Sequence, residues 1–463
     1  MSLHPQRREF LAHQRWFGGK GRDFEVTDVR VVGRLGEHIR IELVDVTYAE
    51  GQPATETYQM PVVAYDEPQD RLGHALVREG DGEWTYDAVH DREAMDAFLQ
   101  AFVGDGPADP ATGVAFHLLP GHELDRQTHS TLFSGQQSNS SVMYGEDAIL
   151  KVFRKVTAGQ NPDIEIHRAL TEAENHHVAA LYGWIEAAGA TGDSDAERLD
   201  LAMLQQFLRT ATDGWELALA SVRNLYAEED LHAEEVGGDF AAEAHRLGEA
   251  VAAVHADLRT AFGSSTGDAG ELVDTMNRRL DEALVVVPDL AEHEQDLRDL
   301  FADVTSVPGA SGGALPVQRI HGDLHLGQTL RTSLGWKLVD FEGEPAKPLA
   351  ERRLPDSPWR DVAGMLRSFD YAARSVLMDF SPDPELAAQL AYRAQEWTTR
   401  NHTAFLAGYA PDGLDDAAAA LVAAYQADKA IYECGYEARN RPGWLEIPLQ
   451  AIARLGRSGK ETT

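Results

Sequence analysis

The stretch QRIHGDLHLGQTLR, residues 318–331, followed by WKLVDFEGEP, residues 336–345, constrains this chain more than any other part of the sequence. It sets Asp323, Gln328 and Asp340 in the spacing D-x4-Q-x11-D. Asp323 and Gln328 lie on a loop after a short apolar strand, and Asp340 ends a second strand. A hairpin-like return of the chain is expected to bring both aspartates to one end of the two strands.

This pattern matches the needs of phosphoryl transfer. One carboxylate takes the proton of the attacking hydroxyl, while another carboxylate and a neutral oxygen hold magnesium against the nucleotide phosphates. Asp323 suits the first role, and Asp340 with the amide oxygen of Gln328 suits the second. Either aspartate alone would favour a capped loop with surface carboxylates. The joint pattern, with His321 and His325 beside it, favours a phosphotransferase site.

A lysine in the segment AILKVF provides a candidate cation for the phosphates. Lys151 is flanked by apolar residues of a strand, where it is either a gatekeeper on a sheet edge or a functional cation. Glu165 follows 14 residues later on an expected helix capped by Asn161. A strand lysine paired with a helix glutamate is typical of protein-kinase-like folds. Asp163 and Glu172 remain alternative partners.

The segment SGQQSNSSV, residues 134–142, lies between two expected strands just before Lys151. The sequence has neither a G-x-G-x-x-G nor a Walker motif, which excludes a P-loop fold. Small polar residues such as Ser138 and Ser140 can still cover phosphates with hydroxyl and backbone N–H groups. A solvated turn is the plain alternative for this segment.

The succession of patterns predicts an α+β protein with three parts. Residues 1–105 form a mostly β cap, in which the strand 55–65 contains Pro61 and is therefore expected at an edge or bulge. Residues 106–210 form a mixed intermediate subdomain, or N-lobe, with the nucleotide-binding strands and hinge. Residues 211–463 form a helical C-lobe with the catalytic loop and the acceptor site.

Composition excludes several classes of function. The formal net charge is −35, so a nucleic-acid or membrane-surface binder is not expected. The single cysteine, Cys434, excludes a disulfide scaffold and fits a reducing compartment. The N-terminus shows no signal peptide, and no apolar stretch is long enough to span a bilayer. We therefore expect a cytoplasmic protein.

Long motifs spread along the chain resemble the maltokinase family. They include QRWFGGKGR, LKVFRKVTAGQNPDIE, the 318–345 stretch, RRLPDSPWRDVAGMLRS and YEARNRPGWLEIPLQAIARL. The resemblance is to actinobacterial maltokinases, within the aminoglycoside-phosphotransferase-like and protein-kinase-like superfamily. It implies a bilobal protein-kinase-like fold with an N-terminal cap, and it implies ATP and Mg²⁺ as cofactors.

The resemblance also implies roles for individual residues. Asp323 is the base, Gln328 and Asp340 are metal ligands, and Glu342 joins them because Phe-Glu-Gly follows Asp340. Asp361 braces the catalytic loop. The nucleotide contacts are implied at the hinge 202–207 and at the phosphates: Ser138, Ser140, Lys151, Glu165, Gln206 and Phe207.

Sugar recognition needs aromatic faces and planar hydrogen-bonding groups. Tyr432 and Tyr436 are four residues apart and share a helix face, as do Glu433 and Glu437. The plain alternative is an exposed glutamate face beside an aromatic core stripe. The full set of expected acceptor contacts is His325, Trp397, Tyr432, Glu433, Tyr436 and Glu437.

The resemblance implies transfer of the ATP γ-phosphate to the anomeric hydroxyl of maltose, giving maltose 1-phosphate for α-glucan and glycogen synthesis. The alternative is a glucosamine kinase that forms glucosamine 6-phosphate on the same architecture. Cys434, beside Glu433, would reshape a pocket for such a monosaccharide. A non-catalytic module is disfavoured by intact Lys151, Asp323 and Asp340. A complex with trehalose synthase is a further implication.

Overall fold

The computed structural model describes residues 4–51, 53–104, 113–133, 138–187, 198–228, 231–306, 314–344, 347–378 and 384–461. Its contacts divide the chain into two compact units. The N-terminal unit comprises residues 1–171 and 179–209, and the C-terminal unit comprises residues 172–178 and 210–463. The expected boundary between cap and intermediate subdomain, at 105/106, lies outside the described residues, and that division stays a prediction.

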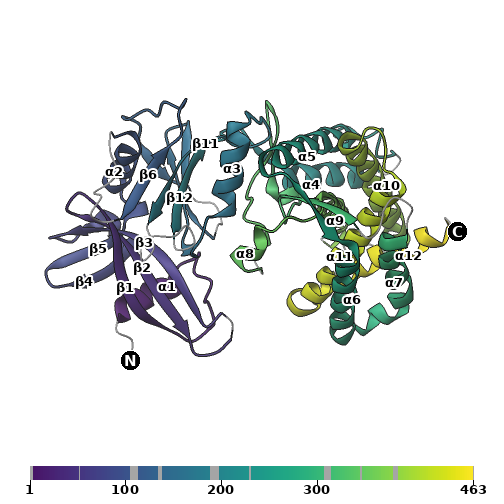
Figure 1. The fold of residues 1–463 in the computed structure, drawn as a ribbon, viewed down its shortest axis with the longest axis horizontal. Helices are drawn as coiled ribbons and strands as arrows, with labels where there is room; N and C mark the ends of the chain where they lie inside the picture. The colour runs from purple at the N-terminus through teal and green to yellow at the C-terminus, as the bar shows by residue number, and fades with distance from the viewer. Residues whose placement is uncertain are drawn as a thin grey trace. The chain divides into compact units, whose positions relative to one another are not determined.

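The N-terminal unit is rich in strands (Figure 1). Its elements are α1 (Pro5–His13), β1 (Phe24–Leu35), β2 (Ile39–Tyr48), β3 (Thr55–Tyr65), β4 (Leu76–Gly80), β5 (Glu83–Asp87), α2 (Arg92–Val103), β6 (Val114–Leu118), β7 (Ser130–Leu132), β8 (Ser140–Tyr144), β9 (Ala148–Val152), β10 (Lys155–Val156), α3 (Pro162–Glu172), β11 (Leu181–Ala187) and β12 (Leu199–Gln206).

The C-terminal unit is mainly helical, which together with the strand-rich first unit confirms the α+β class. Its elements are β13 (Thr212–Asp213), α4 (Gly214–Ala227), α5 (Ala241–Phe262), β14 (Ser264–Asp268), α6 (Ala269–Val286), α7 (Glu294–Ser306), β15 (Ala314–Gln318), β16 (Thr329–Thr332), β17 (Gly335–Leu338), α8 (Leu349–Arg352), α9 (Pro358–Met378), α10 (Pro384–Tyr409), α11 (Asp416–Asn440) and α12 (Glu446–Glu461).

The first sheet has the order β1-β2-β3-β5-β4, with β10 also paired to β3. Pro61 therefore lies in a central strand whose pairing with β2 shows no register shift, so it marks neither the expected edge nor the expected bulge. The proline is tolerated because β10 pairs with residues 57 and 58, whereas β5 pairs with residues 62 to 65. Pro61 falls between these two partners, where a missing N–H breaks no ladder on that side.

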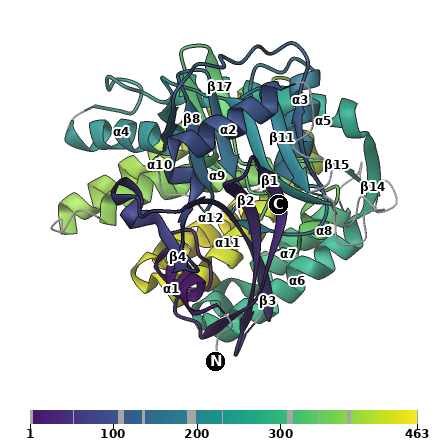
Figure 2. The ribbon, with the colours of Figure 1, turned by 90° about the vertical axis from the view of Figure 1, so that its left-hand side faces the viewer.

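The second sheet has the order β6-β11-β12-β9-β8-β7, and its neighbouring strands are antiparallel. Helix α2 lies across this sheet (Figure 2). The rings of Phe98 and Phe102 on α2 lie 5.9 and 5.1 Å from the ring of Phe116 on β6. Strands β8 and β9 form the hairpin expected around the Gly-Glu-Asp turn, and β9 carries Lys151. Asn161 accepts the N–H of Asp163 at 2.8 Å, so the expected cap of α3 is confirmed.

In the C-terminal unit, α5 and α10 pack with their backbones unusually close. A Cβ at Gly248 of α5 would lie 2.2 Å from the carbonyl oxygen of Phe405. A Cβ at Gly408 of α10 would lie 2.0 Å from the carbonyl oxygen of His245. Only glycine fits at these two positions, so the crossing is specified by the sequence.

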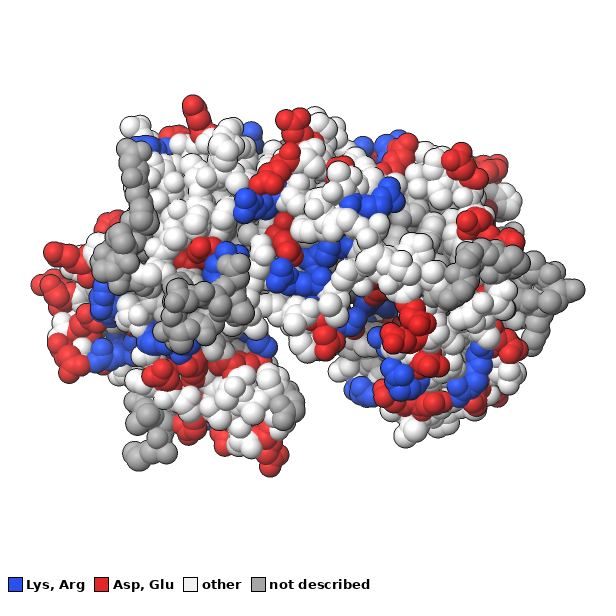
Figure 3. Space-filling view, in the orientation of Figure 1, with Lys and Arg blue, Asp and Glu red and all other residues white. Residues whose placement is uncertain are grey.

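Surface charge and hydropathy agree with the composition. Figure 3 shows acidic side chains on both units, interspersed with basic ones, over the face that is drawn. Within the described ranges, no helix combines the length and the apolar character that crossing a bilayer requires.

Candidate active site

The loop that carries Asp323 is held by one buried carboxylate at the start of α9. Asp361 accepts the backbone N–H of His321 at 2.7 Å and that of Gly322 at 2.9 Å. Its oxygen Oδ2 also lies 3.0 Å from Nε2 of His255. Burial raises the pKa of Asp361, but the hydrogen bond and charge of His255 outweigh it, and the net pKa is lowered. The expected bracing role of Asp361 is therefore confirmed.

Gly322 adopts a backbone conformation that favours glycine, with φ at 86°. This turn directs the chain from the buried end of the loop toward Asp323, which is only partly buried. The backbone N–H of Asp323 points to Nδ1 of His321 at 3.4 Å, and Nε2 of His321 hydrogen-bonds to the carbonyl oxygen of Val339 at 2.9 Å. His321 thus ties the loop to the end of β17.

Asp323 lines a cavity of about 520 Å³ that lies within the C-terminal unit. This volume is typical of sites for small molecules. Nζ of Lys429, on α11, lies 3.4 Å from Oδ1 of Asp323 and 5.4 Å from the ring centre of Tyr432. A carboxylate beside a lysine at the wall of such a cavity is suited to proton transfer from a bound hydroxyl.

The cavity wall is strongly polar and carries both signs of charge. Besides Asp323 and Lys429, its charged residues are Arg279, Glu282, Glu344, Lys347, Glu351, Arg360, Asp361, Asp428 and Arg439. Most of the acidic groups have a basic partner: Arg360 donates to Glu344 at 2.8 Å, and Arg279 pairs with Asp428. Arg279 binds Oδ2 of Asp428, whereas the other carboxylate oxygen, Oδ1, is buried without a hydrogen-bond partner among the described residues.

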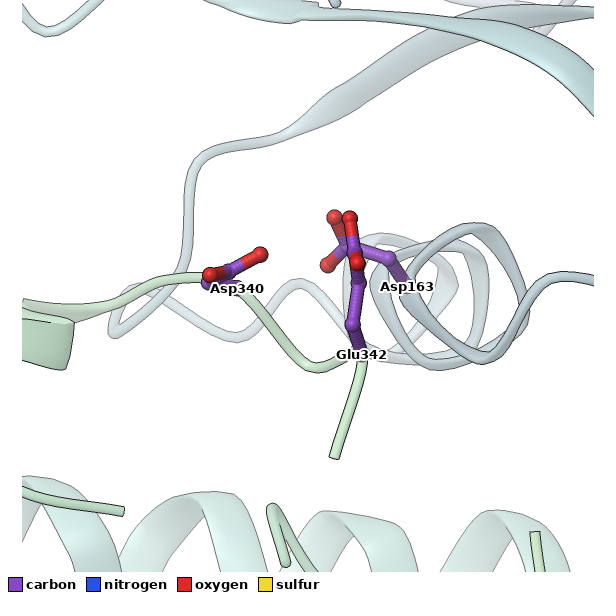
Figure 4. Close-up of side chains that lie close together, drawn as sticks. All are labelled: Asp163, Asp340 and Glu342. Carbon is purple, nitrogen blue, oxygen red and sulfur yellow. The ribbon is translucent and has the colours of Figure 1, made fainter. Parts of the chain in front are cut away.

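Two carboxylates follow β17 on one loop, Asp340 and Glu342 (Figure 4). Their oxygens lie within 4.8 Å of one another. Asp340 has a left-handed backbone, with φ at 67°, which is uncommon outside glycine and often marks a functional position. The third side chain drawn in Figure 4, Asp163, belongs to α3 of the N-terminal unit.

Gln328 lies next to this loop because its carbonyl oxygen accepts the N–H of Val339 at 3.1 Å. The antiparallel pairing of β16 with β17 sets Thr329 opposite Leu338, so Gln328 and Asp340 leave the hairpin at the same end. The hairpin differs from the expected one, because β17 pairs with β16, which follows Gln328, whereas β15, before Asp323, pairs with β14. Two carboxylates and one amide are an all-oxygen donor set, and this set fits Mg²⁺.

In the N-terminal unit, Nζ of Lys151 lies 2.9 Å from Oδ2 of Asp163. Oδ1 of Asp163 lies 3.0 Å from Nδ1 of His167. Burial alone would raise the pKa of Asp163, but the charges of Lys151 and His167 lower it strongly. Asp163, which the sequence offered as an alternative to Glu165, is therefore a partner of Lys151. The expected contact of Glu165 stays a prediction.

The segment before β8 is described from Ser138 onward, and residues 134–137 lie outside the described residues. Ser138 is exposed, whereas the hydroxyl of Ser140 accepts Nε–H of Arg154 at 2.8 Å. At the hinge, the N–H of Gln206 donates to Ala180 and that of Phe207 donates to Asp147, both at 2.8 Å. These two N–H groups are therefore already satisfied, and the expected nucleotide contacts of Gln206 and Phe207 stay predictions.

Tyr432 and Tyr436 line the cavity of Asp323, with exposed fractions of 47% and 46%. The two glutamates expected beside them do not. Glu433 is bound by Nη2 of Arg367 at 2.6 Å, and Glu437 is bound by Arg441 at 2.6 Å. Both glutamates face away from the cavity because each is one residue, about 100° of helix, from its tyrosine.

Trp397 was also expected to contact the acceptor, and this expectation was wrong. Its side chain is only 1% exposed, and its indole N–H donates to Oγ of Ser221 at 3.1 Å. It packs beside Phe240 and Phe369 in the core of the C-terminal unit. His325 likewise lies off the wall of the cavity, where its Nδ1 accepts the N–H of Gly327 at 3.1 Å.

Sequence reasoning missed several residues of the cavity. Lys429 was detectable, because it lies three residues before Tyr432 and seven before Tyr436 on the same face of α11. Glu344 and Asp428 gave no comparable signal, because their neighbours come from distant parts of the chain.

Comparisons with known proteins agree with this architecture. Residues 10–91 match the maltokinase N-terminal cap domain. The chain is 28% identical over 411 residues to the glucosamine kinase of Streptacidiphilus jiangxiensis, covering 83% of this chain and 89% of the relative. It is 26% identical over 389 residues to the glucosamine kinase of Mycolicibacterium smegmatis, covering 83% and 93%.

Solved structures show the same fold. A glucosamine kinase in complex with glucosamine, ADP and inorganic phosphate matches with a TM-score of 0.69 and 22% identity, covering 98% of this chain and 100% of that one. A second crystal form of glucosamine kinase matches with a TM-score of 0.64. The chain is therefore similar to the maltokinase N-terminal cap domain over residues 10–91, and it has the fold of the glucosamine kinase structures.

Proposed function

We propose that this protein is an ATP-dependent sugar kinase in which Asp323 is the general base. The observation that carries the proposal is the position of Asp323, on a braced loop at the wall of a cavity sized for a small molecule. Its carboxylate accepts the proton of a sugar hydroxyl as the hydroxyl oxygen attacks the γ-phosphorus of ATP. Lys429 orients this carboxylate from α11.

The nucleotide roles are assigned to residues of each unit. Asp340, Glu342 and Gln328 would hold Mg²⁺, which neutralises charge on the nucleotide phosphates when bound. In the N-terminal unit, Lys151 would bind phosphate oxygens, and Asp163 would hold the ammonium group in place. Two observations support these roles: the ion pair of Lys151 with Asp163, and the closeness of the Asp340 and Glu342 carboxylates at a left-handed backbone position.

The favoured acceptor is glucosamine, and the relatives named glucosamine kinase support it because the likeness covers more than four fifths of this chain. An ammonium group on the sugar requires an acceptor of hydrogen bonds. Oδ1 of Asp428 is such an atom, since it is buried at the cavity wall without a partner among the described residues. Burial raises the pKa of Asp428, and a cationic ligand would offset that cost.

Maltose is the second candidate, supported by the match of residues 10–91 to the maltokinase cap. The tyrosine pair of α11 also offers aromatic faces for a sugar ring. With maltose as the acceptor, the product is maltose 1-phosphate, and a complex with trehalose synthase belongs to this candidate.

Release of ADP measured with glucosamine, glucose, maltose and an aminoglycoside tests the proposal. Glucose is the matched control because it differs from glucosamine in lacking the amine. We expect glucosamine to have the highest kcat/KM, falling toward pH 9 as the amine loses its proton. Asp428→Asn should lower kcat/KM for glucosamine more than for glucose. Turnover of maltose but not of glucosamine would make maltose the acceptor. No turnover of any of these sugars would overturn the proposed kinase function.

A further inference from the structure

Arg154 connects β9, the strand that carries Lys151, to the first sheet, β1-β2-β3-β5-β4 with β10, which is called the cap sheet below. It lies two residues after the end of β9, and its guanidinium is fully buried. Its backbone carbonyl oxygen accepts the N–H of Gln59, on β3, at 2.7 Å. The next two residues form β10, which pairs with β3. Arg154, only three residues after Lys151, is therefore hydrogen-bonded to the cap sheet.

Two cap residues hold the guanidinium. Nη2 of Arg154 donates to Oδ2 of Asp87, at the end of β5, at a distance of 2.7 Å. The ring of Trp16 lies 4.6 Å from the guanidinium carbon, within the range of a cation–π contact. Asp87 is 1% exposed, so neither charge is screened by solvent. Removal of one partner would leave the other charge buried and unpaired, which is strongly unfavourable.

The same side chain binds the segment beside Lys151. Nε of Arg154 donates to the hydroxyl of Ser140 at 2.8 Å, and the Arg154 N–H donates to Oδ1 of Asn139 at 3.3 Å. Ser140 begins β8, where Ser141 lies opposite Lys151 in the ladder. One residue therefore fixes both the cap carboxylate and the end of the segment proposed to contact phosphates.

We propose that Arg154 is a positioning residue through which the cap sets the nucleotide affinity of this protein. Asp87 and Trp16 fix the guanidinium, and the guanidinium fixes Ser140, while the backbone N–H of the same residue holds Asn139. Ser140 begins the strand that lies opposite Lys151. This role rests on the proposed kinase function. It gives the cap a part in ATP binding and none in the choice of sugar.

The test uses three variants of the full chain and one matched control. Asp87→Asn removes the carboxylate charge that holds the Arg154 guanidinium. Trp16→Leu removes the cation–π contact with the same guanidinium and leaves its ion pair with Asp87 in place. Arg154→Lys keeps the charge but cannot donate to Asp87 and Ser140 together. The control is Glu83→Gln. Glu83 lies on β5, the strand of Asp87, and its ion pair with Arg40 of β2 also measures 2.7 Å.

Two readouts are measured on each variant. Calorimetry of ADP binding and the KM values for ATP and sugar report on affinity. Hydrogen exchange of the amides of residues 138–144 reports on the segment itself and needs no activity. We expect the ADP Kd and the ATP KM to rise about tenfold in Asp87→Asn and Arg154→Lys, with the sugar KM unchanged within about twofold. Exchange at 138–144 should be faster, and Glu83→Gln should match the wild type in all of these measurements.

Unchanged exchange and unchanged ADP affinity in Trp16→Leu and Arg154→Lys would overturn the role of Arg154. An equal rise in the KM values for ATP and sugar would also overturn it, because the defect would then be general. If Asp87→Asn does not fold, Trp16→Leu and Arg154→Lys decide the matter. If the wild type binds no nucleotide, the kinase proposal fails on that result, whereas exchange at 138–144 still decides whether the cap positions the segment.

Discussion

At the scale of single residues, one buried carboxylate and two left-handed backbone positions determine the geometry of the site. Asp361 satisfies two backbone N–H groups of the loop before Asp323, and this is possible because Gly322 takes a left-handed turn. Asp340 adopts a similar left-handed backbone without being glycine. The energetic cost of that conformation is small for Asp and Asn, so the position selects a residue with a short polar side chain.

We predict that Asp340→Asn keeps the fold, because Asn tolerates the left-handed backbone, but raises the magnesium concentration required for half-maximal activity. The measurement is a titration of activity with Mg²⁺ at saturating ATP. Gln328→Ala should shift the titration in the same direction by less, since an amide oxygen contributes less than a carboxylate. A mutant that saturates at the wild-type magnesium concentration would remove Asp340 from the ligand set.

Asp200, on β12, gives a prediction about pH and stability. Burial raises its pKa to about 6, against the N–H of Asn161 and the charge of Arg198. The folded state therefore holds this proton more tightly than the unfolded state, where the pKa is about 3.9. Its contribution to stability is complete below about pH 4 and is lost as the pH rises through about 6.

The Tm of the wild type, compared with that of Asp200→Asn, tests this sign. The wild type should lose stability relative to the variant between about pH 4 and 6, and the difference should be constant above about pH 7. A difference that stays flat, or that grows in favour of the wild type over this interval, would contradict the raised pKa.

At the scale of elements, helix α11 separates its two faces by function. Lys429, Tyr432 and Tyr436 line the cavity, whereas Glu433 and Glu437 bind arginines away from it. The sequence could predict that the tyrosines share one face and the glutamates another, because that follows from helical periodicity. It could not predict which face meets the cavity, since that depends on the distant Arg367 and Arg441.

Other elements show the same division between local and distant causes. The hairpin of β8 and β9, the cap of α3 and the strand of Lys151 follow from local patterns, and all of them were predictable. Pro61 was placed wrongly because two strands from different parts of the chain share the same side of β3. Trp397 was misplaced because a tryptophan near polar residues in a helix gives no local sign of how deeply it is buried.

We predict opposite effects for the two aromatic positions. Tyr436→Ala should raise the sugar KM about 2- to 12-fold, which corresponds to about 0.5–1.5 kcal/mol for an aromatic contact, and leave the ATP KM unchanged. Trp397→Phe should lower the Tm through loss of the bond to Ser221, and leave the sugar KM unchanged. Both KM values and the Tm are measured on each variant. A raised sugar KM in Trp397→Phe alone would contradict the assignment of the cavity.

At the scale of the whole molecule, the chain combines a strand-rich unit that carries Lys151 with a helical unit that carries Asp323. Its net charge of −35 would disfavour an anionic ligand unless basic groups are gathered locally. The cavity of Asp323 instead sets basic groups, among them Arg279, Lys429 and Arg439, beside its carboxylates, so that the two signs of charge nearly balance. The proposed kinase function depends on this local balance, which the overall composition does not reveal.

The most direct test of the account is the identity of the product made from ATP and glucosamine. Mass spectrometry of the reaction of the wild type with Mg²⁺ should detect a sugar carrying one added phosphate, formed in step with ADP. Asp323→Asn should keep the wild-type Tm and form this product about 10²- to 10⁴-fold more slowly. An Asp323→Asn rate above about one third of the wild-type rate would contradict the role of Asp323, and ADP formed without any phosphorylated sugar would contradict the proposed function.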